Sequence, residues 1–379
     1  MTDHHRAGPD RSPQAPAGVV GVDTWQPRPA RTARPARPAR PAPHRRLVSS
    51  LALAAAAACV LAACGSDDDG EPATNPDVDT TEEPGGDPAD AGGPVTVDTT
   101  HGPIELDQPA TRVVALEWSS AENLLALGVE PVGVADIEGY ELWVSAGPQL
   151  SDDVVDVGTR QEPSLEQIEA LEPDLIVTDD DRSVVNIDQL QDIAPTYSSD
   201  FYGHPDGQLQ AMRDTFTDTA VLTGAEDRAA EVLAELDQRA AEFGTALAAS
   251  DIEPTFLLTQ GYTYEGAATV RVFGSPTYAS ELLAAGGMEN GWPGDTDAYG
   301  LTDTDVEGLT TAAPSSSLIY VAQEGDNIFT GQLADNPIYQ SLEFVETGRV
   351  YPIDPGTWLW GGPLTATTVY DEVQAALGF

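Results

Sequence analysis

Apolar runs and segments with helical spacing alternate along the chain between residues 112 and 178, a pattern that predicts successive α/β units. The predicted order is strand 112–118, helix 121–128, strand 131–136, loop 141–160, helix 164–171 and strand 175–178. Strands and helices that alternate in this way are typical of a parallel sheet covered by helices. The strand ends carry Trp118, Trp143 and Arg160, and ligands bind at the carboxyl ends of such strands. We therefore expect these three residues to border a binding cleft.

A long helical segment separates this region from a second one of similar order. Residues 225–249 are rich in Ala, Leu, Glu and Arg, with apolar residues at Val232, Leu233, Leu236, Ala240, Phe243 and Leu247. A helix of this length would extend roughly 37 Å, which is enough to connect two lobes. Beyond it, TFLLTQ predicts a strand, ASELLAAGG a helix, and VEGLTTAAPSSSLIYVA a helix, a proline and a strand, much like SLEQIEALEPDLIVT in the first region. The pattern predicts two α/β lobes joined by one long, rigid helix, with the ligand cleft between them.

The N-terminal region has the features of a secretion signal. Arg45 and Arg46 precede an apolar segment, Leu47–Ala63, that is too short for a typical membrane span and ends in small residues. The sequence Leu-Ala-Ala-Cys that ends at Cys64 resembles the bacterial lipobox, in which the cysteine is diacylated. The alternative is an ordinary signal peptide whose cysteine is accidental. We predict a lipoprotein that is held on the outer face of the cell membrane by the lipid on Cys64.

Composition then divides the chain into five parts. They are a signal region (1–63), an acidic tether expected to be disordered (64–94), an N-terminal lobe (95–224), a connecting helix (225–250) and a C-terminal lobe (251–379). The tether has almost no large apolar residue, so burial there would not offset the loss of chain entropy.

Charge and composition exclude several classes of function. All 17 basic residues are Arg, and residues 64–379 carry 8 Arg against 60 Asp and Glu, a net charge of −52. Such a field repels nucleic acids and anionic membrane surfaces. The two cysteines, Cys59 and Cys64, precede the folded part, and only His101 and His204 follow Cys64, so we expect no cysteine chemistry and no metal site built on histidine. No nucleophile motif, phosphate loop or dinucleotide fingerprint occurs, which argues against an enzyme such as a surface hydrolase. A surface adhesin is the third class, and two lobes around a cleft argue against it.

Aromatic residues and a few arginines remain as candidates for ligand binding. The tryptophans after the tether lie at or near predicted loops: Trp118, Trp143, Trp292, Trp358 and Trp360. Each could be an ordinary core residue, but aromatic clefts with few polar groups are typical ligand sites. Tyr299 follows in a Gly-rich loop, and the guanidinium of Arg160 suits two-pronged contact with ligand oxygens, although it could simply pair with an acid.

Four motifs carry a family resemblance: LEW at 116–118, LWVS at 142–145, VGTRQEPSLE at 157–166 and TWLWGGPLTA at 357–366. They resemble the ferric hydroxamate branch of the substrate-binding family of iron-siderophore and cobalamin ABC importers, and the similarity extends over about residues 103–378. The resemblance implies the class III substrate-binding fold, with an Fe(III)-siderophore in a shallow cleft and the iron held by the siderophore rather than by the protein. It implies ligand contacts at Trp118, Trp143, Arg160, Tyr299, Trp358 and Trp360.

In this comparison an aromatic expected after the 175–178 strand is replaced by the acidic loop Asp179–Arg182, so Arg182 becomes a further candidate for ligand contact. The resemblance also implies docking to an ABC permease, which works with an ATPase, through Glu166 and Glu307. Alternatively, these two acids stand at helix N-termini only because the helix dipole favours a negative charge there. We expect a monomer that has no cofactor apart from the lipid.

The charge of the chain favours one class of siderophore. Ferric citrate and catecholate complexes are anionic, whereas a ferric trihydroxamate is neutral or cationic, so an acidic protein with eight arginines suits a hydroxamate better. A citrate-type or catecholate siderophore, haem and cobalamin remain the alternatives.

Overall fold

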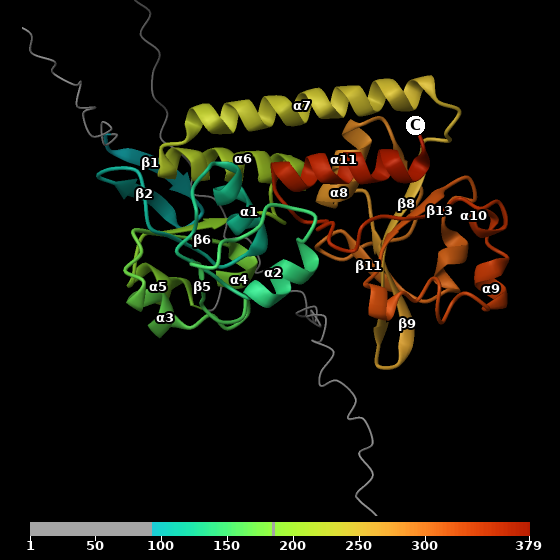
Figure 1. The fold of residues 1–379 in the computed structure, drawn as a ribbon, viewed down its shortest axis with the longest axis horizontal. Coiled ribbons are helices and arrows are strands. Elements are labelled where there is room, and N and C mark those ends of the chain that lie inside the picture. Colours follow the sequence, from blue (N-terminus) through green and yellow to red (C-terminus); the bar gives the residue numbers. More distant parts are fainter. Residues whose placement is uncertain (1–92, 184–185) are drawn as a thin grey trace, which may run out of the picture. The chain divides into compact units, whose positions relative to one another are not determined.

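Two α/β lobes make up the part of the chain that the structure, a computed structural model, describes: residues 93–183 and 186–379. The predicted signal region, Cys64 and nearly all of the predicted tether lie outside the described residues. Both lobes belong to one compact unit, and each contains its own sheet (Figure 1). The predicted fold class is confirmed.

The N-terminal lobe is built on a parallel five-stranded sheet with the strand order β5-β4-β3-β6-β7. An antiparallel hairpin, β1–β2, precedes the sheet in the chain. The elements of this lobe are β1 (Val95–Thr99), β2 (Gly102–Leu106), β3 (Val113–Ala115), α1 (Trp118–Ala126), β4 (Gly133–Val134), α2 (Ile137–Trp143), β5 (Val155–Asp156), α3 (Leu165–Ala170), β6 (Leu175–Asp179), α4 (Asp180–Ser183), α5 (Ile187–Gln191) and β7 (Thr196–Ser199).

The central strands of this sheet are buried on both faces, which explains their continuous apolar runs. In β3, Val113 and Ala115 join one core cluster and Val114 joins another, because successive side chains point to opposite faces. The next strand, β6, repeats the pattern, with Val177 in the first cluster and Ile176 in the second. The register between these two strands is therefore set by burial on both sides.

The C-terminal lobe contains a mixed sheet in the order β11-β9-β8-β12-β13, with β10 paired to β8. β8, β12 and β13 run parallel, whereas β9 pairs antiparallel with both β8 and β11. The elements are β8 (Thr255–Tyr264), β9 (Ala267–Phe273), α8 (Tyr278–Ala285), β10 (Glu289–Asn290), β11 (Leu301–Thr304), η1 (Gly308–Thr311), β12 (Ser317–Val321), η2 (Glu324–Asp326), α9 (Pro337–Gln340), α10 (Glu343–Glu346), β13 (Val350–Pro352) and α11 (Pro363–Leu377).

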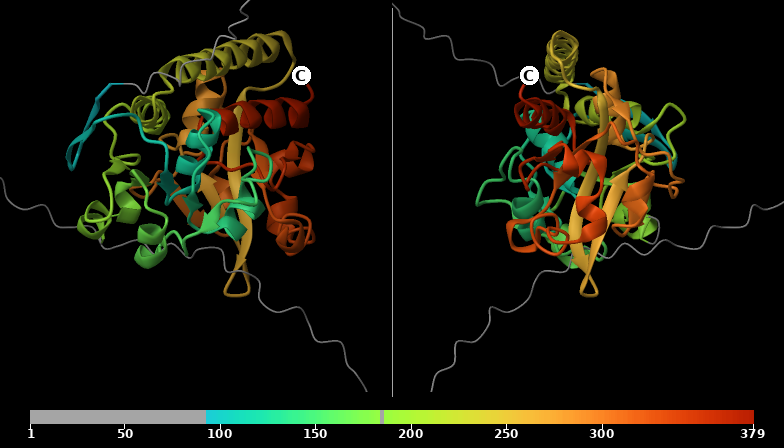
Figure 2. Two further views of the ribbon diagram at one scale, coloured as in Figure 1. Left: turned by 60° about the vertical axis from the view of Figure 1, so that its left-hand side comes forward. Right: turned by 90° about the vertical axis from the view of Figure 1, so that its right-hand side faces the viewer.

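The similarity between the lobes is less complete than the sequence suggested. The helix predicted before Pro314 is only the 3₁₀ turn η1, although β12 follows it as β6 follows α3. The long β8–β9 hairpin, which Figure 2 shows extending beyond the rest of the lobe, has no counterpart in the all-parallel sheet of the first lobe.

One long helix, α7 (Glu226–Ala249), runs along both lobes (Figure 1). It follows α6 (Gln208–Thr223) after Gly224, whose φ of +67° is a left-handed cap conformation that suits glycine. Its 24 residues span roughly 36 Å. The buried stripe of α7 consists of Ala229, Val232, Leu236, Phe243 and Leu247.

The two halves of α7 pack against different partners. Val232 packs in one core cluster with Phe216 of α6. Phe243 belongs to a different core cluster, where its ring centroid lies 4.9 Å from that of Tyr370 on α11. One turn before Phe243, Arg239 Nε lies 2.6 Å from a carboxylate oxygen of Asp371 on α11. The helix is thus attached to elements of both lobes, as the amphipathic pattern predicted.

The α6 helix also contacts both lobes, although the sequence placed it in the first. Gln208, its first residue, accepts a hydrogen bond from the Tyr278 backbone in the C-terminal lobe, and Met212 joins the large core cluster of that lobe. Leu222, near its other end, joins the core of the N-terminal lobe.

Local assignments differ from prediction at three candidate positions. Strand β3 ends at Ala115, so Trp118 opens helix α1 rather than ending a strand. Trp143 is the last residue of helix α2, where a loop was expected, because Asp136 accepts the backbone N–H of Gly139 and caps that helix. The acidic loop after β6 is the single helical turn α4, and Asp179 accepts the Arg182 backbone N–H at 2.8 Å.

Candidate ligand-binding site

A charged or aromatic side chain follows each strand of the parallel sheet. These residues are Glu117 after β3, Asp136 after β4, Arg160 after β5, Asp179 at the end of β6 and Tyr202 after β7. Parallel strands end at one edge of the sheet, so the chain brings these groups to a common edge. That edge is where the sequence predicted a cleft.

At this edge two arginines share one carboxylate. Arg160 Nη1 donates to Glu117 Oε1 at 2.6 Å, and Arg182 Nε donates to Glu117 Oε2 at 2.7 Å. The side chains of Glu117 and Arg160 are only 8% and 5% exposed, and that of Arg182 is 19% exposed. We call Glu117, Arg160 and Arg182 the charged triad. Because both carboxylate oxygens accept a charged donor, each arginine is held in a defined direction.

The charges and the burial at this site lower the pKa of Glu117 and raise that of Asp179. Burial alone would raise the pKa of Glu117, but the guanidiniums of Arg160 and Arg182 outweigh it and lower the pKa to about 2. Burial raises the pKa of Asp179 to about 7, and the charge of Glu117 adds to this rise while Arg182 opposes it. Near neutral pH, Glu117 is therefore ionised, whereas Asp179 is partly protonated.

A row of aromatic rings continues from Arg160 into the second lobe. The Arg160 guanidinium lies 3.5 Å from the Trp118 ring centroid, a cation–π geometry. From Trp118 the successive centroids of Trp358, Trp360 and Phe273 are 4.8, 4.8 and 4.9 Å apart. We call Trp118, Trp358, Trp360 and Phe273 the aromatic row. Trp358 packs on the core of the N-terminal lobe and Trp360 on that of the C-terminal lobe, so the row bridges the two lobes.

A second contact between the lobes lies beside the triad. The Tyr299 hydroxyl, in the loop before β11, donates to Asp181 Oδ1 of α4 at 2.9 Å. The Tyr299 ring also meets that of Tyr202, after β7, at a centroid distance of 4.8 Å and an angle of 79°. Six of the predicted site residues are thus connected, by direct contacts or through one intervening residue: Trp118, Arg160, Arg182, Tyr299, Trp358 and Trp360.

Comparison with known proteins places the chain in a family. Residues 113–357 match the periplasmic binding protein family. The chain belongs to this family. Its members bind substrates for transport and are not enzymes.

Among the relatives is the iron(3+)-hydroxamate-binding protein FhuD of Escherichia coli (strain K12), with 30% identity over 269 residues that cover 70% of this chain and 87% of FhuD. The Fe(3+)-citrate-binding protein YfmC of Bacillus subtilis (strain 168) is also 30% identical, over 247 residues that cover 65% of this chain and 74% of YfmC. A similar solved structure is that of the Desferal-bound siderophore-binding protein FhuD of Vibrio cholerae, with a TM-score of 0.62 and 24% identity, covering 70% of this chain and 97% of that one. This likeness confirms the class III periplasmic binding protein fold.

Two of the predicted tryptophans lie apart from the aromatic row. Trp143 packs against the same N-terminal core cluster as Trp358, at the end of α2, and is partly exposed. Trp292, after β10, packs instead against a core cluster of the C-terminal lobe that includes Leu257 and Leu318. Its buried indole N–H has no hydrogen-bond partner among the described residues. The structure thus gives Trp292 a packing role within the C-terminal lobe, and its contact with a ligand stays a prediction.

The two acids proposed for docking are exposed on different lobes. Glu166 lies in the first turn of α3, and Glu307 is the residue before the turn η1. Both positions are open to a partner protein.

Glu117, Asp179 and Tyr202 were not among the site residues predicted from the sequence. The signal for Glu117 was present, because an acid directly after the buried strand VVAL has little chance of reaching water and requires a partner. Its two partners lie 43 and 65 residues away in the chain, and no local pattern indicated that they would meet.

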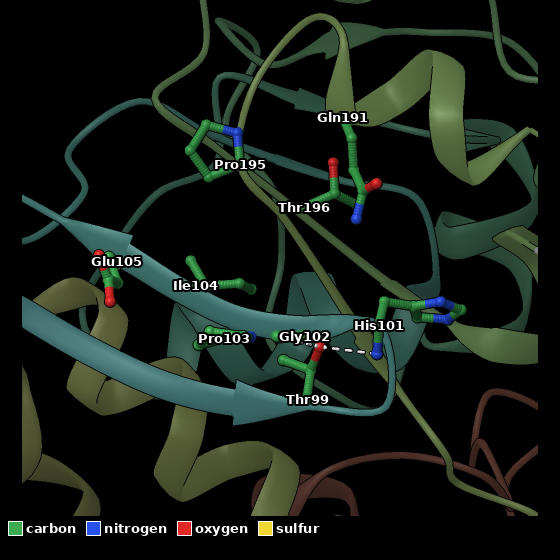
Figure 3. Close-up of a pocket in the computed structure, with 9 residues that line it drawn as sticks. All are labelled: Thr99, His101, Gly102, Pro103, Ile104, Glu105, Gln191, Pro195 and Thr196. Atoms are coloured by element: carbon green, nitrogen blue, oxygen red, sulfur yellow. Dashed lines mark hydrogen bonds between the residues drawn. The ribbon is translucent and has the colours of Figure 1, made fainter.

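A hollow of about 470 Å³ lies away from the triad, between the β1–β2 hairpin and residues Gln191, Pro195 and Thr196 (Figure 3). None of the predicted ligand-binding residues lines it. At its rim, His101 Nε2 lies 2.9 Å from Asp180 Oδ1, which connects the hairpin to α4.

Across residues 93–183 and 186–379, no group of three or more His, Cys, Asp or Glu is arranged to hold a metal ion. No helix in this part of the chain is both long and apolar enough to cross a membrane.

The site offers guanidinium donors, aromatic faces and carboxylates, a set that suits recognition of a ligand with accessible oxygens.

Proposed function

We propose that this protein is the extracytoplasmic binding component of an ABC importer, that it captures an Fe(III)-siderophore of the hydroxamate type, and that it delivers this complex to a membrane permease for iron uptake. The observation that carries the proposal is the aromatic row joined to the charged triad at the edge where both lobes meet. The family assignment and the relatives that bind ferric siderophores support it.

The chemistry of the site suits an iron complex that arrives already chelated. Hydroxamate oxygens around the iron can accept hydrogen bonds from Arg160, while the partly exposed rings of Trp358 and Trp360 offer apolar faces to the body of the ligand. Trp118 is buried in this structure, with the Arg160 guanidinium over its ring, and would reach the ligand beside Arg160. The iron remains with the siderophore. In this proposal Trp143, Arg182, Trp292 and Tyr299 complete the ligand contacts.

The choice between hydroxamate and citrate rests on charge. E. coli FhuD and B. subtilis YfmC are equally similar to this chain in identity, so the relatives support either ligand. Within the site, Glu117 offsets one of the two arginines, and Asp136 and Asp181 lie nearby, which leaves little positive charge for an anion. A ferric citrate or catecholate complex is therefore the second candidate, ahead of haem and cobalamin.

Delivery requires a membrane anchor and a docking partner. We propose that Cys64 carries the lipid that holds the protein at the outer face of the membrane. Exposed Glu166 and Glu307, one on each lobe, would pair with basic residues of the permease, which an ATPase drives. We propose that the protein acts as a monomer.

Titration of the purified protein with ferric complexes tests the ligand. Tryptophan fluorescence is recorded while ferrioxamine B, ferrichrome or ferric citrate is added in separate experiments. Saturable quenching by the hydroxamates with none by ferric citrate supports the proposal. Quenching by ferric citrate alone replaces the hydroxamate assignment with the second candidate, and no saturable response to any ferric complex refutes siderophore binding.

A further inference from the structure

The charged triad contains one acid that the binding of a ferric complex does not itself require. We propose that Glu117 determines the charge class of the ligand: its carboxylate offsets one of the two arginine charges and so makes the site discriminate against anionic ferric complexes. This inference rests on the proposed function, and it assigns to Glu117 a role in specificity rather than in direct ligand contact.

The position of Glu117 supports this role. Its carboxylate is two residues beyond β3, 8% exposed, and engaged at both oxygens by guanidinium groups at 2.6 and 2.7 Å. The backbone N–H of Trp118 also donates to Oε1 at 3.1 Å. With three donors, the carboxylate is held between Arg160 and Arg182 and does not turn toward solvent.

The triad is largely buried, so each of its charges interacts strongly with a charged ligand. An ion pair near the surface is largely screened by water, whereas charges a few ångströms apart with little solvent interact several times more strongly. Two arginines alone would form a doubly positive site suited to an anion. With Glu117 between them, the triad carries a single positive charge. Asp136, 3.8 Å from Arg160 Nε, and Asp179, beside Arg182, reduce the field further.

Specificity of this kind works against the unwanted ligand. A site rejects a competitor by leaving its charge unpaired as well as by binding the preferred ligand well. An anionic complex would bring its charge toward Glu117, which cannot be protonated near neutral pH because the arginines lower its pKa to about 2. A neutral or cationic hydroxamate complex meets no such opposition.

A purely structural role for Glu117 makes a different prediction. If the carboxylate only orients Arg160, its removal would weaken binding of every ferric complex by a similar factor. If Glu117 acts through its charge, the variants change the ratio of the affinities for cationic and anionic complexes. Removal of the acid shifts this ratio toward the anionic complex, and removal of an arginine shifts it toward the cationic one. The charge role also predicts that removing both together restores the original ratio.

The test compares Glu117→Gln, Arg182→Gln and the double variant with the unchanged protein. The dissociation constants of cationic ferrioxamine B and anionic ferric citrate are measured by fluorescence titration at pH 8.5, above the pKa of about 7 of Asp179. Relative to the unchanged protein, Glu117→Gln should shift the affinity ratio roughly tenfold or more toward ferric citrate, and Arg182→Gln should shift it toward ferrioxamine B. The double variant should return close to the original ratio.

Glu138→Gln is the matched control, because it removes the same charge from an exposed position in the first turn of α2. An equal shift in Glu138→Gln and Glu117→Gln would overturn the proposal, since it would reflect total charge alone. So would parallel weakening of both ligands in Glu117→Gln. If Glu117→Gln does not fold, the double variant decides: relative to Arg182→Gln it should shift the affinity ratio back toward ferric citrate, and an unchanged ratio overturns the proposal. Failure of the unchanged protein to bind either complex would refute the proposed function, and this assignment with it.

Discussion

Asp179 offers a direct test of the electrostatics at the site. Its carboxyl lies at the end of β6, accepts the Arg182 backbone N–H and faces the ionised Glu117. Substitution by asparagine keeps an oxygen for that hydrogen bond and removes the charge. We expect Asp179→Asn to have little effect below about pH 4 and to stabilise the protein increasingly as the pH rises to about 7.

The sign and size follow from the raised pKa. In the folded protein the pKa of Asp179 is about 7, against 3.8 for the unperturbed group. The folded state therefore holds this proton more tightly than the unfolded state does. The resulting stability is complete below about pH 4 and is lost as the pH rises to about 7. One unit of pKa is worth about 1.4 kcal/mol, so after an allowance for the partial exposure of Asp179 we expect a loss of about 2 kcal/mol between pH 5 and pH 8.

Urea denaturation at pH 5, 6, 7 and 8, followed by tryptophan fluorescence, measures this dependence. The difference in unfolding free energy between Asp179→Asn and the unchanged protein should grow by about 2 kcal/mol over that range. The control is Asp188→Asn on α5, an exposed acid in the same lobe, which should give a constant difference. A constant difference for Asp179→Asn as well would refute the raised pKa of Asp179 in the folded protein.

Four further predictions concern binding, packing, lobe movement and the anchor. Arg160→Ala should weaken ferric siderophore binding by roughly 10- to 100-fold, as expected for loss of charge-assisted hydrogen bonds, and more than Arg213→Ala on α6; equal effects in fluorescence titrations would contradict the role of Arg160. Phe243→Ala, at a fully buried position of α7, should lower the unfolding free energy by about 3–5 kcal/mol in urea denaturation, and a loss below about 1 kcal/mol would contradict its place in the core. Because α7 is attached to both lobes, small-angle X-ray scattering should show little change in radius of gyration on ligand binding, and a large decrease would indicate a hinge. Cys64→Ala should release the protein from the membrane fraction into the medium, and retention at the membrane would exclude the lipid anchor.

The fold was largely predictable because its main signals are local. The alternation around β3 and β6 and the amphipathic stripe of α7 depend on residues close together in the chain. The β8–β9 hairpin was missed because its apolar run can serve a parallel or an antiparallel strand equally well, and pairing depends on the turn at Glu265–Gly266.

Candidate site residues were predictable where their chemistry was unusual for the chain. Arg160 was conspicuous as one of few arginines, and Trp358 as part of an aromatic motif in a predicted loop. Glu117 was hidden among 60 acids, and only its burial between two distant arginines distinguishes it. Likewise, Trp292 packs against a core cluster built from residues distant in the chain, such as Leu257 and Leu342, and its own neighbourhood does not reveal this.

The single turn α4 joins three parts of the molecule through consecutive residues. Asp180 contacts His101 of the N-terminal hairpin, Asp181 accepts the hydroxyl of Tyr299 from the other lobe, and Arg182 pairs with Glu117. A ligand that displaces Arg182 acts on the same helical turn that carries the contact of Asp181 with the second lobe. Thermodynamic linkage makes this coupling reciprocal. If the ligand strengthens the contact between the lobes by some factor, a partner that separates the lobes lowers the affinity for the ligand by the same factor. The contact between the lobes is then itself a means of release.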